Sequence, residues 1–120
     1  MDLSKFSLIG IADEIGDLIW NAVKNWNSFL KDTIGKQLVN AADSISANLA
    51  EGYGRYTIPE RIRFCYFSRG SLCESINWIQ KADRRGLIEP ILAKKIIGDL
   101  NTLSIKINKY IRSLRSNNFK

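Results

Sequence analysis

The spacing of the apolar residues constrains this chain most, because they recur at intervals of three and four and no alternating pattern persists. That spacing is typical of helices that bury one face, whereas a half-buried strand would alternate. Proline, which a helix interior does not tolerate, occurs only at Pro59 and Pro90. The sequence therefore predicts an all-α fold with four helices, at about residues 11–26, 29–52, 58–85 and 89–116.

The length and composition are those of one soluble domain. The 120 residues are 45% hydrophobic and 25% charged, which is ordinary for a globular protein. Four helices joined by short turns bury their apolar faces most simply when each runs opposite to the one before it. We therefore expect residues 1–120 to form a single antiparallel, up-down-up-down four-helix bundle.

All four predicted helices have apolar residues at helical spacing, and those of the first are Ile15, Leu18, Ile19, Ala22 and Trp26. The second has one line of positions, Ile34, Leu38, Ala41, Ile45 and Leu49. The third has a first stripe of Cys65, Leu72, Ile76 and Ile79 and a second stripe of Phe64, Phe67, Trp78 and Ala82. The fourth has one long face, Leu92, Ile96, Leu100, Leu103, Ile107, Tyr110, Ile111 and Leu114. Because the third helix is apolar on two sides, it needs two neighbours, either within the bundle or in another subunit.

Charged and capping residues indicate where the helices begin and end. Asp13, Glu14 and Asp17 fall near the amino end of the first predicted helix, where carboxylates oppose the helix dipole. Thr57 suits the N-cap of the third helix, because Glu60 follows it at the spacing of a capping box. The third helix should end near Gly86.

The stretch "ANLAEGYGRYTIPE", residues 47–60, is either a phosphate-binding loop or a joint between helices. A phosphate-binding glycine loop follows a strand and opens a helix, whereas this stretch follows a helix and lacks the Lys-Ser/Thr ending of a P-loop. We therefore interpret it as a corner. We expect Gly52 or Gly54 to adopt the left-handed conformation that ends the second helix.

The available residue types disfavour an enzyme and a metal protein. The chain has no histidine, which is the commonest metal ligand and general base, and two cysteines cannot form a four-thiolate zinc site. Cys65 and Cys73 stand about 12 Å apart along one predicted helix, which is too far for a disulfide, so we expect two buried thiols. The sequence indicates no cofactor.

The sequence carries no signal for a membrane. No early segment combines a basic start, an apolar run and a cleavage site, and charges interrupt the apolar stretches before about 18 residues. We therefore expect a cytoplasmic protein without a membrane partner.

The net charge of +6 is unevenly distributed. Residues 1–60 hold 5 basic and 8 acidic side chains, a net charge of −3, while residues 61–120 hold 13 basic and 4 acidic side chains, a net charge of +9. The second half is therefore suited to an acidic partner.

Two linked stretches resemble a known family. "GKQLVNAADSISANLAEGYGRY" (residues 35–56) and "RFCYFSRGSLCES" (residues 63–75) closely resemble the bacterial four-helix-bundle family named for proteins encoded in intervening sequences of 23S rRNA genes. Related members are accessory proteins of diversity-generating retroelements. The matching residues are Gln37-Leu38, Ser44-Ile45, Asn48-Leu49-Ala50-Glu51-Gly52, Arg55, Phe64, Arg69-Gly70-Ser71-Leu72 and Glu74.

The resemblance implies a protomer that assembles into a ring-like homopentamer with a basic surface and with no known catalytic activity. In the retroelement branch it implies binding to a reverse transcriptase and to nucleic acid. Family membership alone does not fix the role of one member.

Eight motif residues are candidates for a structural or interface role: Asn48, Glu51, Gly52, Arg55, Arg69, Gly70, Ser71 and Glu74. Paired carboxylates are able to divide acid and base roles in an enzyme. We favour the interpretation that Glu51 and Glu74 pair with Arg55 and Arg69 where the second and third helices pack, because a charge between apolar stripes needs a partner. For Arg69 we predict a buried or intersubunit ion pair.

Two further features have a functional and a structural interpretation. Gly70-Ser71 is either a catalytic serine or a place where another helix comes close, and the lack of histidine favours packing. The aromatic residues Trp20, Trp26, Trp78, Phe64 and Phe67 are either stacking platforms for unpaired bases or core and interface residues. We favour core and interface roles for them.

Six basic residues of the last helix are candidates for binding nucleic acid or a partner: Lys94, Lys95, Lys106, Lys109, Arg112 and Arg115. No acid follows Leu100, so several copies in a ring would form a multivalent positive surface. Such a patch binds phosphate backbones without reading sequence. It also suits an acidic protein, or it is simply a solvated face.

The sequence thus favours a non-enzymatic, oligomeric helical bundle that binds RNA, DNA or a protein acting on nucleic acid. The alternative is a structural module that binds only other proteins and whose basic residues keep it soluble. An enzyme ranks third, because no convergent set of catalytic residues is recognisable.

Overall fold

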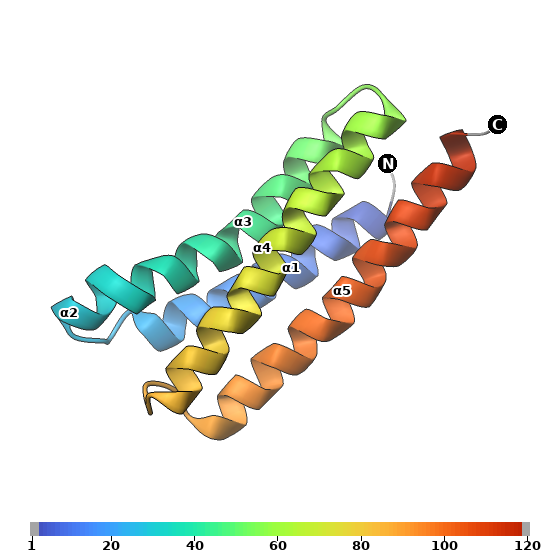
Figure 1. Ribbon diagram of the computed structural model, residues 1–120. Helices are drawn as coiled ribbons and strands as arrows, with labels where there is room; N and C mark the ends of the chain where they lie inside the picture. Colours follow the sequence, from blue (N-terminus) through green and yellow to red (C-terminus); the bar gives the residue numbers. More distant parts are fainter. Residues whose placement is uncertain (1–2, 119–120) are drawn as a thin grey trace.

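The computed structural model describes residues 3–118, with side chains for residues 8–116, and every regular element among them is helical (Figure 1). In chain order the elements are α1 (Leu3–Val23), the short α2 (Ser28–Leu30), the π-helical turn η1 (Lys31–Gly35), α3 (Lys36–Tyr53), α4 (Ile58–Arg84) and α5 (Pro90–Asn118). The predicted all-α class with four long helices is confirmed. No helix in the described part has the length and apolar character needed to cross a membrane.

The four long helices pack side by side into a body of 52 × 23 × 21 Å. Helix α1 contacts α3 and α5, and α4 also contacts α3 and α5. Figure 1 shows the turns after α1 and α4 at one end of the bundle and the turn between α3 and α4 at the other. As a result, the first half of α4 lies beside the second half of α5.

The core runs along the whole bundle and is almost entirely aliphatic. The apolar line predicted for the second helix is buried. In the fourth helix the buried residues of the predicted face are Ile96, Leu100, Leu103, Ile107, Ile111 and Leu114. The largest completely buried apolar side chains are Ile15, Ile19, Leu38, Ile45, Leu72, Ile79, Ile96, Leu100, Leu103 and Ile107. Burying a side chain of this size stabilises the fold by about 1.5–3 kcal/mol relative to exposing it.

Helix α1 differs from its prediction at both ends. It begins at Leu3 and ends at Val23, whereas the prediction was residues 11–26. The reason for the longer start is that Leu8 and Ala12 are buried and continue the apolar stripe of the helix. Consequently Asp13 and Asp17 lie in the middle of α1, away from the helix terminus, and the predicted dipole interaction does not apply to them.

The second predicted helix is one helical run interrupted by a π-turn. Asn27 caps its start, because its Oδ1 accepts a hydrogen bond from the Leu30 backbone N at 3.0 Å. The wider η1 turn brings Gly35 against α1. A Cβ atom at Gly35 would lie 2.9 Å from both the Leu30 carbonyl oxygen and Val23 Cγ1, so a side chain at this position would push the two helices apart.

The corner between α3 and α4 forms without a left-handed glycine. Gly54, at the end of α3, has φ −79° and ψ −4°, and Gly86 is the one residue with positive φ in the described part. The prediction that Gly52 or Gly54 adopts the left-handed conformation is therefore wrong. Gly52 instead permits close helix packing, because a Cβ atom there would lie 2.7 Å from Phe64 Cβ.

Both predicted signals at the ends of α4 are confirmed. Thr57 Oγ1 accepts a hydrogen bond from the Glu60 backbone N at 3.3 Å, which caps the start. At the other end Gly86 has φ +72°. The Leu87 backbone N donates to the Ala82 carbonyl at 2.9 Å, as in a Schellman ending.

Two serines on the inner face of α4 are completely buried, Ser68 and Ser75. Ser68 Oγ donates to the Ile45 carbonyl oxygen of α3 at 2.8 Å, whereas Ser75 Oγ donates to the Ser71 carbonyl of its own helix at 2.8 Å. The Ser68 bond therefore joins α3 and α4 at a fixed register, and both hydroxyls are satisfied as buried polar groups require.

Candidate nucleic-acid interface

The six basic candidates on α5 are all exposed, but they fall into two groups. Lys94 and Lys95 lie near the start of the helix, about 30 Å along its axis from Arg115. Lys95 Nζ lies 3.0 Å from Asp99 Oδ2, and both residues line the groove between α1 and α5. The charge of Lys95 is thus already partnered.

The second group occupies the last turns of α5. Lys106, Lys109, Arg112 and Arg115 are exposed, and none of them forms an ion pair with an acid among residues 8–116. Their charges are therefore free to attract an anion. Arg115 is turned toward α4, where its Nη2 donates a hydrogen bond to the Tyr66 hydroxyl.

Helix α4 adds aromatic and cationic side chains to this group. Arg69 Nη1 donates to Asn108 Oδ1 of α5 at 2.9 Å. The Tyr66 ring lies near two guanidinium groups, with its centroid 4.9 Å from Arg69 Cζ and 5.9 Å from Arg115 Cζ. Tyr66 and Asn108 were not identified from the sequence; only their positions relative to Arg69 and Arg115, on helix faces that the tertiary structure brings together, reveal them.

A second aromatic cluster lies toward the start of α4. The rings of Phe64 and Phe67 meet edge to face, with centroids 5.3 Å apart. Arg55 lies over Phe64 at 4.6 Å, and Arg63 lies over Phe67 at 5.5 Å. Phe67 is 44% exposed, so the second apolar stripe predicted for the third helix is only partly covered by the chain itself.

The prediction of an ion pair at Arg69 does not hold within one chain. Arg69 is half-buried, its hydrogen-bond partner is the neutral amide of Asn108, and no acid among residues 8–116 pairs with it. The physical reason is that α5, the helix beside Arg69, has no acid after Asp99. An ion pair with another subunit stays a prediction.

The motif residues of α3 form local contacts. Glu51 Oε1 accepts from Arg55 Nη2 at 2.7 Å, one helical turn away, and Arg55 Nε lies 3.9 Å from Glu60 Oε2 of α4. The Asn48 side chain donates to the Ser44 carbonyl at 2.9 Å. With Gly52 packed against Phe64, these residues hold the corner between α3 and α4 together.

Two motif residues of α4, Gly70 and Glu74, lie on the outside of the bundle. Gly70 is exposed, and a Cβ atom there would meet nothing within 4 Å, so the expected close approach of another helix does not occur within the chain. Glu74 Oε1 accepts from Trp78 Nε1 at 3.4 Å, so of the two predicted acids Glu51 pairs with one of the predicted arginines, Arg55, whereas Glu74 pairs with neither among residues 8–116. Ser71 is half-buried, and its carbonyl oxygen accepts from Ser75.

The two thiols differ in accessibility. Both are free, but only Cys65 is buried, whereas Cys73 is exposed. The expectation that both are buried is thus wrong for Cys73, because this residue lies on the outer ridge of α4 near Gly70. Within residues 8–116, no cluster of three or more acidic or thiol side chains has an arrangement that would hold a metal ion.

Carboxylates gather on the opposite side of the bundle, where α1 and α3 pack. A Cβ atom added at Gly16 would lie 3.0 Å from Asp43 Oδ1, so the Asp43 carboxylate lies close against α1. Partial burial raises the pKa of the Asp43 carboxyl above its ordinary value, and the negative charges of Asp13 and Asp17 raise it further. The chain therefore has an acidic side and a basic side.

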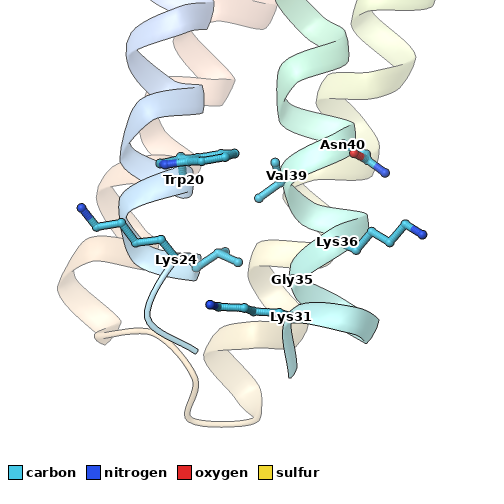
Figure 2. Close-up of a pocket in the computed structure, with 8 residues that line it drawn as sticks. Trp20, Lys24, Lys31, Gly35, Lys36, Val39 and Asn40 are labelled. Atoms are coloured by element: carbon cyan, nitrogen blue, oxygen red, sulfur yellow. The ribbon is translucent and has the colours of Figure 1, made fainter. Parts of the chain in front are cut away.

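A pocket of about 350 Å³ lies between the end of α1 and the start of α3. Figure 2 shows Trp20 and Val39 facing one another across this gap, with Lys24 and Lys31 below them, while Lys36 and Asn40 point away. Trp20 is 57% exposed. The pocket is at the end of the bundle where α1 ends, whereas Tyr66 lies in the half of α4 that begins at the opposite end (Figure 1), so Trp20 belongs to a separate surface.

Comparisons with known proteins agree with this architecture. A crystal structure of a protein of unknown function from the S23 ribosomal protein family of Bacteroides thetaiotaomicron superposes with a TM-score of 0.81, covering 91% of this chain and 98% of that chain at 18% identity. At that identity the similarity concerns the fold. No curated protein matches significantly. The model of the family described as 23S rRNA-intervening sequence protein matches residues 6–109, and the chain therefore belongs to that family.

Proposed function

We propose that this protein is a non-enzymatic, cytoplasmic assembly protein that binds RNA, DNA or a protein acting on nucleic acid through the last turns of α5. The observation that carries the proposal is the group of exposed, unpaired cations Lys106, Lys109, Arg112 and Arg115. Phosphate groups are the anions that such an unpartnered basic surface attracts most strongly, because counterions are released when they bind.

The proposal includes an antiparallel bundle that assembles into a ring of five copies, as expected from the resemblance to the family. A ring would present the same cations five times, so that one nucleic acid would bridge several protomers. Such multivalent binding raises the overall affinity well above that of one patch.

The test is binding of the purified oligomer, its mass determined by light scattering, to labelled structured RNA and duplex DNA. The logarithm of the binding constant falls linearly with the logarithm of the salt concentration, and each phosphate contact in a duplex contributes about −0.9 to that slope. If four cations contact phosphates, the affinity therefore falls about 150-fold between 50 and 200 mM salt. Replacing Lys109 and Arg112 by glutamate should leave about two contacts and reduce that fall to about 12-fold. A matched variant with glutamate at Lys24, in the turn after α1, and at Lys36, at the start of α3, should behave like the original protein.

The second candidate function is a structural module that binds only proteins. The observation in its favour is the outer ridge of α4, where exposed Phe67 and the open space beside Gly70 suit another helix. If neither the original protein nor the glutamate variant at Lys109 and Arg112 binds nucleic acid, this second function replaces the first; if both bind equally well, the last turns of α5 are not the binding site.

A further inference from the structure

We propose that the outer face of α4, together with the last turns of α5 beside it, is a binding site for unpaired bases, so that the nucleic acid this protein prefers is single-stranded. The site, which we call the arginine–aromatic surface, consists of Arg63, Tyr66, Phe67 and Arg69 of α4 and Arg112 and Arg115 of α5. The inference rests on the proposed function and adds to it a class of ligand and a mode of contact.

The aromatic rings of this surface are accessible. Phe67 is 44% exposed and Tyr66 is 38% exposed, although both belong to residue types that a lone bundle would normally cover more completely. The Phe67 and Phe64 rings meet edge to face, and the guanidinium of Arg63, whose side chain is 64% exposed, lies over the Phe67 ring. A planar ligand therefore reaches the Phe67 face by displacing one solvated side chain.

The cations of the surface lie beside the rings. Arg69 and Arg115 both lie near the Tyr66 ring, and Arg69 is held there by its hydrogen bond to Asn108. Arg112 follows Asn108 by one helical turn, so it lies on the same side of α5. None of Arg69, Arg112 and Arg115 is paired with an acid among residues 8–116, so the surface combines free positive charge with exposed π faces.

This combination selects among polyanions. In a duplex the base faces are stacked inside the helix, so a duplex offers phosphates and groove edges to the arginines but no base face to the rings. A single strand exposes both its phosphates and the faces of its bases, which stack on aromatic rings and on guanidinium planes. An acidic peptide would use the charges but would leave Tyr66 and Phe67 without a role.

The experiment compares fluorescein-labelled single-stranded RNA with a duplex of the same length at one salt concentration. The test variant is Tyr66→Leu with Phe67→Leu, which removes the rings and keeps every charge. Stacking of one base on one ring corresponds to about 5- to 150-fold in affinity. The affinity of the double variant should therefore fall by at least about 5-fold for the single strand and by less than about 2-fold for the duplex. Trp20→Leu, an exposed aromatic at the other end of the bundle, should change neither affinity.

A second measurement uses the unaltered protein. RNA that contains 5-bromouridine, irradiated in the complex and mapped by mass spectrometry, should cross-link to Tyr66 or Phe67. Cross-links found only outside the arginine–aromatic surface would overturn the inference even if the double variant failed to fold.

The outcomes separate the inference from the proposed function. Equal binding of single strand and duplex, unaffected by loss of the two rings, would overturn the inference and leave the proposed function intact. Absence of binding to either nucleic acid at 50 mM salt would overturn both. A double variant with a smaller oligomer mass would assign the rings to a contact between subunits and would also overturn the inference.

Discussion

Substitution of Gly52 by alanine tests the close packing of α3 on α4 most directly. The added Cβ atom would lie 2.7 Å from Phe64 Cβ and 3.3 Å from the Arg61 carbonyl oxygen. Both neighbouring atoms belong to or adjoin the α4 backbone, so no side-chain rotation relieves the contact. The helices have to separate, and overpacking of this kind costs about 1–3 kcal/mol.

Within a helix, alanine is also more stable than glycine by about 0.5–1 kcal/mol. This gain opposes the cost of overpacking. The matched control is therefore Gly98→Ala in α5, because Gly98 is exposed and a Cβ atom there meets nothing within 4 Å. The gain from helix propensity is common to both variants and cancels in the comparison. The difference between them is the cost of the contact alone.

The assay is thermal unfolding followed by circular dichroism at one fixed protein concentration, since assembly would make the melting temperature depend on concentration. For 120 residues, 1 kcal/mol corresponds to about 4 °C, so the Gly52→Ala variant should melt about 4–12 °C below Gly98→Ala. Phe64→Ala should not rescue it, because the Cβ atom of residue 64 remains. Equal melting temperatures for the two alanine variants would refute the proposed close approach of the helices.

Three further predictions concern burial and charge. Because the folded pKa of Asp43 is raised, the folded state binds its proton more tightly and loses stability as the pH rises from about 4, the usual pKa of an aspartate. Asp43→Asn should therefore raise the melting temperature at pH 7 but not at pH 3; an effect equal at both pH values would contradict this. Ser68→Ala removes the bond to the Ile45 carbonyl and should cost about 1 kcal/mol, more than Ser75→Ala, whose bond is local; calorimetry giving the reverse order would count against the role of Ser68. A maleimide should label exposed Cys73 in the native protein and buried Cys65 only after unfolding, and equal labelling rates in mass spectrometry would contradict their assigned burial.

Much of the fold was predictable because apolar periodicity reports directly which face of a helix is buried. The line from Ile34 to Leu49 and the long face of α5 were identified in this way, and Thr57 and Gly86 marked the ends of α4 through local hydrogen bonding and backbone geometry. These features depend on neighbours within about one turn, so the order of residues is sufficient to recognise them.

The start of α1 and the role of Gly52 were not predictable by the same means. The first residues of α1 carry a weak pattern, and their helical state depends on Leu8 and Ala12 packing against the rest of the core. A glycine near a helix end suits either a left-handed turn or a close approach of two helices. Only the position of Phe64 shows that Gly52 serves the second purpose.

The candidate site also combines features that follow from the sequence with features that depend on tertiary contacts. The sequence alone determined that the second half of the chain is basic and that α5 carries cations without acids after Asp99, since charge and helical spacing are properties of the chain itself. Only the tertiary structure decided that Arg69 meets Asn108, that Arg115 meets Tyr66, and that Cys73 stays exposed. Periodicity assigns a residue to a face of its helix, but the packing of one helix on another decides what that face meets.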